Sequence, residues 1–363
     1  MYKIGVITHW GSLDNYGQTL QTYALQKKIA ELGYEPFLIR YKEDGIKRPL
    51  WRKLLSASNP IYLKNALENK RLNRIDYNNN IIHKRDLRIF LDNTIEQAPL
   101  IYGRDDLLTE PPFADVYVTG SDQVWNKLDK SYFLDFIKDR KKIAYAASFG
   151  SAVYKGRELK EVGDMLKEFS HITVREKNGV NICKEAGIDD VMVVPDPTIL
   201  IDAEHYRRIS DDIPAGKPYM LIYMLGNKTD FDLQRCYEFA AENNLEVKYI
   251  AGQRQKDDYP KVYPSMQQWL GLIDNAACVV TNSFHGSVMS LILNTPFITV
   301  PLSGKNSKMN SRIETLLDNF DLNSRMTSDL SVIRESIDFR KVNDRIVFLR
   351  EFGTQKLLDM IER

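Results

Sequence analysis

Residues 3–39, KIGVITHWGSLDNYGQTLQTYALQKKIAELGYEPFLI, contain the pattern from which the fold class follows. A β-rich segment from Lys3 to Thr8 enters a polar loop. From Gln18 to Leu32 apolar side chains then recur at helical spacing, and Gly33 suits the end of that helix. Glu35 to Ile39 is again β-rich. This order predicts two parallel strands joined by a helical crossover, and we therefore expect an α/β protein.

The same alternation continues along most of the chain. Further strands are expected in the first half at Asp115 to Thr119, Lys142 to Ala147, Ile172 to Val174 and Val191 to Val194. In the second half strands are expected at Tyr219 to Leu225, Val247 to Ala251, Cys278 to Thr281 and Phe297 to Val300. Helices are expected at Asp230 to Asn243, Met266 to Asp274, Gly286 to Leu293 and Val342 to Ile361. The pattern predicts parallel sheets with helices on both faces.

A change of composition divides the chain into two halves. Residues 210–218 combine two acids, a glycine and two prolines, as a linker does. We expect a Rossmann-like domain over residues 1–209, a second over 210–340 and a closing helix over 341–363. The two domains are predicted to face each other across a cleft, with ligands bound beyond the carboxyl ends of the strands.

A basic insertion, predicted to be mainly helical, interrupts the first domain at about residues 40–110. Between Arg40 and Arg88 the chain has thirteen Lys or Arg and five Asp or Glu. One interpretation is a surface that meets an anionic acceptor at a membrane. The other is an ordinary solvated charged face. The sequence leaves both open.

The composition of the whole chain excludes several classes of protein. Fifty Lys and Arg balance forty-nine Asp and Glu over 363 residues, so no strong field favours nonspecific binding to nucleic acid. The longest apolar runs are too short to span a bilayer. The first residues form a strand-like run without a basic stretch or cleavage site, so we expect a cytoplasmic protein. The three cysteines form no C-x-x-C pair and are expected to be reduced and buried: Cys183, Cys236 and Cys278.

Two loops after predicted strands carry residues suited to binding polar groups. The loop from Thr8 to Gln18 contains Asn15 and Gly17 and opens a helix, whose first turn suits an anion; an ordinary turn with a structural His9 is the alternative. A second predicted strand ends in the run Gly120-Ser121-Asp122-Gln123-Val124-Trp125-Asn126. Asp122 can accept a hydrogen bond or a proton from a sugar hydroxyl, or it can cap a turn.

Arg175 stands at the end of another predicted strand, before Glu176. Its guanidinium can hold a carboxylate or a phosphate through two parallel hydrogen bonds. The alternative is a surface ion pair with Glu176, which would contribute little. The run Val194-Pro195-Asp196-Pro197-Thr198 is interpreted as a structural turn.

The most informative stretch is Val279-Val280-Thr281-Asn282-Ser283-Phe284-His285-Gly286-Ser287. A buried strand ends there in polar residues, and His285 stands in the first turn of the following apolar helix. Because a helix N-terminus disfavours imidazolium, we expect His285 to act as a general acid or base. Ser283, Gly286 and Ser287 are predicted to contact the same ligand as His285.

Cationic residues follow the last predicted strand of the second half. Lys305, Lys308 and Arg312 are candidate anion contacts, or exposed loop charges. Gly304-Lys305 is no P-loop, because Thr299 stands where the first glycine of that motif belongs. The sequence predicts no metal site, since it shows no cluster with metal-ligand spacing.

Six short motifs, in this order, resemble those of the polysaccharide pyruvyl transferase family. They are Asn15-Tyr16-Gly17, Gly120-Ser121-Asp122, Ser148-Phe149-Gly150, Val174-Arg175-Glu176, Asp196-Pro197 and Ser283-Phe284-His285-Gly286. The resemblance spans roughly residues 1 to 320. It implies the two-domain glycosyltransferase B fold, with Arg175 and His285 in the positions of the family's Arg and His. Many members carry an Arg two residues before that His, where this chain has Ser283.

The resemblance also implies a reaction. A transferase of this family moves the pyruvyl group of phosphoenolpyruvate onto two sugar hydroxyls, forming a ketal and releasing phosphate, and no cofactor is expected. Arg175, Ser283, Gly286, Ser287, Lys305 and Lys308 would bind the donor, His285 and Asp122 would be catalytic, and Asn15, Gly17, Ser121 and Asn126 would bind the acceptor.

The implied acceptor is a sugar or lipid-linked oligosaccharide of a capsule or exopolysaccharide, met in the cytoplasm or at the inner face of the membrane. The sequence gives no indication of the oligomeric state. A nucleotide-sugar glycosyltransferase and a non-catalytic glycan-binding or anion-binding protein are the alternatives.

Overall fold

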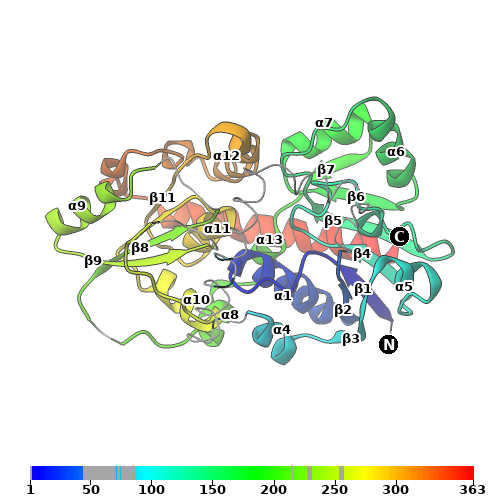
Figure 1. Ribbon diagram of the computed structural model, residues 1–363, viewed down its shortest axis with the longest axis horizontal. Coiled ribbons are helices and arrows are strands. Elements are labelled where there is room, and N and C mark those ends of the chain that lie inside the picture. Colours follow the sequence, from blue (N-terminus) through cyan, green and yellow to red (C-terminus); the bar gives the residue numbers. More distant parts are fainter. Residues whose placement is uncertain are drawn as a thin grey trace.

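The computed structural model describes residues 2–43, 71, 74, 85, 87–214, 216–226, 231–252 and 257–363, with residues 305 and 306 described by their backbone only. Within this part the chain forms two parallel sheets, one of seven strands and one of four. The sheets lie one beyond the other along the long axis of the molecule, and helices cover both (Figure 1). The α/β class predicted from the sequence is confirmed.

The first sheet has the doubly wound strand order β3-β2-β1-β4-β5-β6-β7. Its strands are β1 (Lys3–Ile7), β2 (Glu35–Tyr41), β3 (Gln97–Tyr102), β4 (Val116–Thr119), β5 (Lys141–Ala147), β6 (His171–Val174) and β7 (Val191–Val193). The order reverses between β1 and β4, which is the point at which such sheets bind ligands. The helices of this half are α1 (Tyr16–Glu31), α4 (Arg88–Thr94), α5 (Arg104–Thr109), α6 (Gly156–Leu166), α7 (Lys177–Glu185) and α8 (Ala203–Ile209).

The second sheet has the strand order β11-β10-β8-β9. Its strands are β8 (Tyr219–Met224), β9 (Glu246–Ala251), β10 (Cys278–Thr281) and β11 (Phe297–Thr299). They are connected through α9 (Gln234–Glu242), α10 (Met266–Asp274) and α11 (Phe284–Ile292), and α12 (Asn310–Asp318) follows. Short 3-10 helices are η1 (Lys130–Phe133), η2 (Pro197–Leu200), η3 (Gly304–Met309), η4 (Asn323–Arg325) and η5 (Leu330–Arg334).

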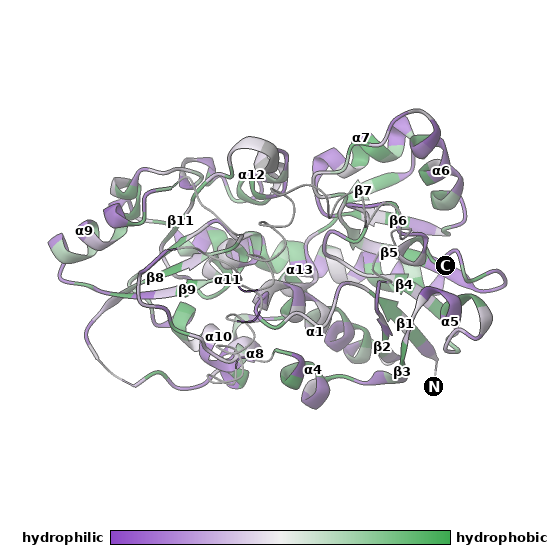
Figure 2. Cartoon of the chain, viewed as in Figure 1, coloured by the Kyte–Doolittle hydropathy of each residue, from purple (hydrophilic) through white to green (hydrophobic). Residues whose placement is uncertain are grey.

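Hydrophobic patterning explains why these segments form sheets. Every residue of β4, β8 and β10 is buried, as expected for parallel strands covered on both faces. Figure 2 shows hydrophobic residues concentrated on the strands, whereas outer helices such as α6 alternate hydrophilic and hydrophobic positions. Cys183, Cys236 and Cys278 are buried and free, which confirms the prediction for the cysteines.

A long closing helix, α13 (Phe339–Glu362), joins the two halves. Its first turns place Val342 and Ile346 in the hydrophobic cluster that contains α10 and α11. Its last turns place Leu357 and Met360 against the first sheet. Figure 1 shows the helix passing behind both halves and ending near the amino-terminal strand. This helix covers the segment for which a closing helix is predicted and begins two residues earlier, at Phe339.

The amino-terminal end of α1 packs directly against the second half. The Tyr16 ring stacks on Trp269 with ring centroids 5.0 Å apart and an interplanar angle of 12°. The Tyr16 hydroxyl donates a hydrogen bond to the carbonyl of Pro264 at 2.6 Å. Buried aromatic pairs of this kind add about 0.5–1.5 kcal/mol beyond their area burial. The carboxyl ends of the two sheets are thus held close together, as the predicted facing domains require.

The expected helical insertion at residues 40–110 is only partly helical, because it contains strand β3. The middle of β3, residues 99–101, is exposed, so an edge strand here lacks the apolar alternation by which it could be predicted. The basic stretch between Arg40 and Arg88, apart from a few residues, lies outside the described part of the chain. No helix that the structure describes is long and apolar enough to cross a membrane.

Candidate functional site

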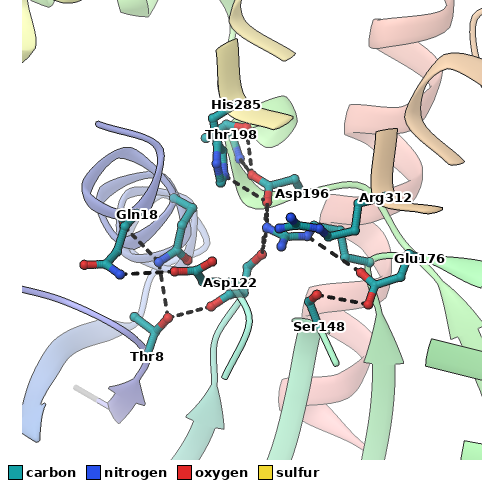
Figure 3. Close-up of polar contacts among 12 residues, drawn as sticks. Thr8, Gln18, Asp122, Ser148, Glu176, Asp196, Thr198, His285 and Arg312 are labelled. Carbon is teal, nitrogen blue, oxygen red and sulfur yellow. Dashed lines mark hydrogen bonds and ion pairs between the residues drawn. The ribbon is translucent and has the colours of Figure 1, made fainter. Parts of the chain in front are cut away.

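The site is organised around Asp196, in the turn that follows β7. Its Oδ2 accepts a hydrogen bond from Arg175 Nη1 at 2.9 Å and another from Ser121 Oγ at 3.0 Å. Its Oδ1 accepts hydrogen bonds from the Thr198 amide at 3.0 Å and the Thr198 hydroxyl at 2.7 Å, which caps η2. Figure 3 shows Asp196 between the labelled His285 and Arg312. The carboxylate is fully buried.

His285 reaches the same carboxylate from the second half of the molecule. It lies in the first turn of α11, and its Nε2 is 3.4 Å from Asp196 Oδ2. The structure thus brings His285 and Arg175, which the sequence placed in different domains, onto one oxygen atom. The three side chains meet because each follows the carboxyl end of a strand, and the carboxyl ends of β6, β7 and β10 face the same space.

The charges in this cluster stabilise one another. Burial alone would raise the pKa of Asp196, but the neighbouring His285 and Arg175 and the Thr198 amide hold it well below its usual range. Burial alone would lower the pKa of Arg175, but Asp196, Glu176 and Asp122 raise it. Asp196 therefore stays a carboxylate and Arg175 a guanidinium.

Arg175 is a buried residue and not part of a surface ion pair. Its guanidinium lies over the Phe284 ring, 4.6 Å from the centroid, and its Nε is 3.9 Å from Glu176 Oε2. Glu176 is itself buried and accepts hydrogen bonds from Ser148 Oγ at 2.9 Å and the Phe149 amide at 3.1 Å. Among the described residues, Arg175 Nε and Nη2 have no hydrogen-bond partner. Donors left open in this way are suited to a bound anion.

Gly17 makes room for His285. A Cβ atom at residue 17 would lie 2.1 Å from His285 Nδ1, which no side chain tolerates. The first turn of α1 therefore packs against the imidazole and helps to hold its orientation. Asn15, two residues earlier, caps α1 by accepting a hydrogen bond from the Gln18 amide at 3.2 Å.

The residues around His285 build the start of α11. Ser283 is the N-cap, and its Oγ accepts a hydrogen bond from the Gly286 amide at 3.3 Å. Ser287 Oγ shares a hydrogen bond of 2.6 Å with Thr299 Oγ1 on β11. A Cβ atom at Gly286 would lie 2.6 Å from Thr281 Oγ1. These three predicted donor-binding residues thus lie beside His285, with both hydroxyls already hydrogen-bonded within the fold.

A second carboxylate, Asp122, lies at the carboxyl end of β4 with a left-handed backbone, φ 79°. Its Oδ2 is 3.5 Å from His9 Nδ1 and accepts a hydrogen bond from Gln18 Nε2 at 3.3 Å. His9 Nε2 is 3.7 Å from Glu43 Oε1. Backbone strain of this kind is concentrated at functional sites.

The Asp122 and His9 pair is electrostatically coupled. Burial alone would raise the pKa of Asp122, but hydrogen bonding to His9 and the charges of Arg175 and His285 lower it. Burial alone would lower the pKa of His9, but Asp122 and Glu43 raise it. Sequence analysis favoured a structural role for His9, because a lone histidine in a loop gives no sign of its partner.

The remaining predicted residues lie apart from Asp196. Asn126 Oδ1 accepts hydrogen bonds from the amide and hydroxyl of Ser151, which closes a loop. Lys308 is exposed. Lys305 lies in η3, and its side chain is outside the described part of the structure.

A cavity of about 320 Å³ opens beside the cluster. Arg175, Asp196, Phe284 and Arg312 line it together with apolar residues of α13. This volume is at the lower end of the range of about 300–1,000 Å³ for small-molecule sites. A larger hollow of about 1090 Å³ lies against β2, β3 and the end of α1, but none of the predicted site residues lines it.

Two features of this site were not predicted from the sequence. The turn at Asp196 is structural, as the sequence indicates, because Asp196 Oδ1 caps η2. Its other carboxylate oxygen, Oδ2, contacts Arg175, Ser121 and His285, which was not predicted. The only sequence signal was the short Asp196-Pro197 motif. Arg312, seen in the sequence as one of several loop charges, is buried next to Arg175.

The model of the polysaccharide pyruvyl transferase family matches residues 15–304. The chain therefore belongs to the polysaccharide pyruvyl transferase family. The match includes both halves of the site, from Asn15 to the α11 helix with His285, and it confirms the resemblance seen in the motifs. No curated protein matches the chain.

Several solved structures are similar over nearly the whole chain at low sequence identity. A putative UDP-N-acetylglucosamine 2-epimerase from Listeria monocytogenes is 9% identical with a TM-score of 0.47, covering 99% of this chain and 95% of that chain. The UDP-N-acetylglucosamine 2-epimerase from Rickettsia bellii is 10% identical with a TM-score of 0.48, covering 99% and 96%. The calicheamicin glycosyltransferase CalG4 is 13% identical with a TM-score of 0.38, covering 100% and 97%. The fold of this chain is therefore described by its own two parallel sheets, one of seven strands and one of four.

Proposed function

We propose that the protein transfers the pyruvyl group of phosphoenolpyruvate to two hydroxyl groups of a sugar. One hydroxyl proton goes to the donor methylene, both hydroxyl oxygens bond to C2, and the bond between C2 and the phosphate oxygen breaks, with the second proton leaving on phosphate. The products are a pyruvate ketal and phosphate. The observation that carries this proposal is the convergence of Arg175 and His285 on Asp196, beside a small cavity between the two halves. Membership of the family supports it.

His285 is the acid or base in this proposal. Protonation of the donor methylene makes C2 electrophilic, and the attacking hydroxyl must lose its proton. A histidine placed for such transfers accelerates a reaction by roughly a hundredfold to ten-thousandfold. Asp196, 3.4 Å from Nε2, and Gly17, packed against Nδ1, would position the ring.

Arg175 binds an anionic group of the donor in this proposal. One edge of its guanidinium is held by Asp196, and Nε and Nη2 have no hydrogen-bond partner among the described residues, although Glu176 Oε2 lies 3.9 Å from Nε. The donor carries a carboxylate and a phosphate, and either can use those free N–H groups. Because Arg175 is fully buried, a bond formed there is not weakened by solvent.

Asp122 and His9 lie on the acceptor side in this proposal. The side chain of His9 is 25% exposed, so this pair is open to a large polar molecule in a way that Asp196 is not. The acceptor we propose is a sugar of a polysaccharide or of its lipid-linked precursor, at the inner face of the cytoplasmic membrane.

The deciding experiment compares donors. The purified protein is incubated with candidate glycans and either phosphoenolpyruvate or a nucleotide sugar, and both released phosphate and the mass of the glycan are measured. We expect phosphate release that depends on both phosphoenolpyruvate and glycan, with the mass gain of a pyruvate ketal. A hexose added from the nucleotide sugar would contradict the proposal and favour the glycosyltransferase alternative.

A further inference from the structure

The site contains a serine at a position where many members of this family carry an arginine. Ser283 is 3% exposed and is used as the N-cap of α11, so it supplies no positive charge to the donor. A donor with a carboxylate and a phosphate needs more positive charge than Arg175 supplies, because Asp196 already neutralises that guanidinium. Another cation is therefore expected to supply the positive charge that the arginine at the position of Ser283 supplies in many members.

Arg312, in the first turn of α12, is a buried cation without an ion-pair partner among the described residues. It is 7% exposed, and its one hydrogen bond, from Nε to the Met309 carbonyl, is long at 3.4 Å. Burial and then the charge of Arg175 lower the pKa of Arg312 to about 10. The carboxylates of Glu176, Asp122 and Asp196 favour its charged form, but none of them forms an ion pair with it. An anion that enters next to Arg312 therefore gains a buried cation with N–H groups left to donate.

Arg312 and Arg175 both line this cavity. Arg175 comes from the first half of the chain and Arg312 from α12 of the second, and the Phe284 ring lies between α11 and the guanidinium of Arg175. The rest of the wall is mainly apolar and includes Leu349 and Phe352 of α13. Figure 3 shows Arg312 projecting towards Asp196 and Glu176. Two guanidinium groups facing an apolar hollow form a site for one compact anion.

Among the residues whose side chains the structure describes, the other cations that line this cavity, Lys177 and Arg345, have partners. Arg345 donates from Nε and Nη2 to the Asn319 carbonyl and side chain, each at 3.0 Å, and lies over the Phe348 ring. Lys177 Nζ is 2.7 Å from Asp318 Oδ2. Lys308 is exposed and does not line the cavity.

We propose that Arg312 replaces the missing arginine and binds, together with Arg175, one anionic group of the donor in the cavity between α7, α11, α12 and α13. This inference rests on the proposed function for the identity of the donor. The residue lies beyond the part of the chain that the family model matches, so sequence comparison within that part does not reveal it.

The test compares Arg312→Gln with Arg312→Lys, with Lys308→Gln as the rival cation from the sequence prediction, and with Arg340→Gln as the charge-matched control. Arg340 is 95% exposed at the start of α13. A charge-assisted hydrogen bond is worth about 1.5–3 kcal/mol, so R312Q should raise the KM for phosphoenolpyruvate about 10- to 100-fold. R312K keeps the charge and should raise the KM less, while R340Q should stay within about twofold. A larger effect of K308Q than of R312Q would overturn the proposal.

A second measurement does not depend on turnover. Inorganic phosphate is titrated into the acceptor-free protein by calorimetry, against chloride of equal ionic strength, for the wild type, R312Q and R312K. The wild type should bind phosphate, and R312Q should lose at least tenfold in affinity. Equal phosphate binding by the wild type and R312Q contradicts the role of Arg312. If R312Q does not fold, as judged by circular dichroism, the same comparison is made with R312K, for which unchanged affinity and unchanged KM are the contradicting results.

The two proposals can fail separately. Phosphate binding that needs Arg312, without turnover of phosphoenolpyruvate on any glycan, would retain the anion site and reject the proposed function. Turnover of phosphoenolpyruvate with an unchanged KM in R312Q would retain the function and reject the role of Arg312.

Discussion

Asp196 and Asp122, two of the buried carboxylates of the site, differ in what surrounds them. Asp196 is sealed from solvent and is held by Arg175, Ser121 and Thr198 of its own half, with His285 reaching it from the other. Asp122 belongs to a looser group, since its partner His9 is partly exposed and their closest atoms are 3.5 Å apart. The first carboxylate lies where the halves meet, and the second lies on the loops of the first half alone.

This difference separates two tasks that the proposed reaction requires. Protonating the donor and stabilising charge at its C2 need a dry, fixed arrangement of charges. Receiving a large sugar needs access, which the Asp122 and His9 pair provides. The comparison therefore assigns donor chemistry to the Asp196 cluster and acceptor orientation to the Asp122 cluster.

The largest expected effect follows from Asp196→Asn. The variant keeps the shape but leaves Arg175 buried without its counterion, and breaking a buried pair in this way costs about 3–5 kcal/mol of stability. Phosphate release should fall by a hundredfold or more, because His285 also loses its partner. Urea unfolding and the phosphate assay measure the two effects. Asp318→Asn, at the exposed pair with Lys177, is the matched control. Wild-type stability and activity in D196N would contradict the central position of this carboxylate.

The next effect tests whether the orientation of His285 depends on α1. Gly17→Ala places a methyl group against the imidazole, where a Cβ would be 2.1 Å from Nδ1. Overpacking of this kind costs about 1–3 kcal/mol, and a misplaced catalytic group can cost about a hundredfold in rate.

Gly216→Ala is its control, because the nearest atom to a Cβ there is 3.9 Å away. Both variants are compared by urea unfolding and by the rate of phosphate release. Equal activity of G17A and G216A would show that α1 does not hold the ring.

A smaller effect is expected on the acceptor side. His9→Gln should raise the KM for the acceptor by about tenfold at most, which corresponds to one lost hydrogen bond, and leave the KM for the donor unchanged. A change in the donor KM alone would reverse the assignment of the two clusters. Initial rates at varied concentrations of each substrate make the distinction.

The pH dependence of stability gives an independent test of His9. The pKa of His9 in the folded protein is raised above its ordinary value of 6.5 by Asp122 and Glu43, so the charged form is stabilised by folding. The extra stability of the wild type over H9Q is therefore full below pH 6.5 and is lost as the pH rises through the folded pKa. Urea unfolding of both proteins across this pH range measures the difference. An advantage that grows with pH would contradict the ion pair with Asp122.

The smallest effect is expected for Ser283→Ala. Losing an N-cap costs about 0.5–2 kcal/mol, and activity should change little if the hydroxyl caps α11. Urea unfolding and the donor KM are measured together. A KM for phosphoenolpyruvate raised tenfold without loss of stability would instead favour the donor-binding role that the sequence suggests for Ser283.

Most of the fold could be predicted from the sequence because the buried parallel strands are short, apolar and bounded by polar turns. The predicted bounds of β10 and α10 agree with the structure, and those of β1 and β8 differ by one residue. Strand β3 was not predicted, since its apolar run does not alternate, contains Pro99, which argues against a strand, and is exposed in the middle.

The site could be predicted in part. His285 and Arg175 stand at strand ends, where a sheet presents its ligands, so position alone indicated them. The meeting of Asp196 with both depends on how the two halves pack, and no local pattern contains that information. Arg312 was indistinguishable from other loop cations, because burial and the absence of a counterion arise only from tertiary structure.

The central claim is that His285 performs proton transfer on a donor held beside Asp196 and Arg175. It is tested most directly by the rate of phosphate release from phosphoenolpyruvate, with a glycan acceptor, for the wild type and His285→Ala under identical conditions. The account predicts a loss of at least a hundredfold in H285A, with a urea midpoint and circular dichroism spectrum like those of the wild type. Phosphate release at the wild-type rate by folded H285A would contradict it.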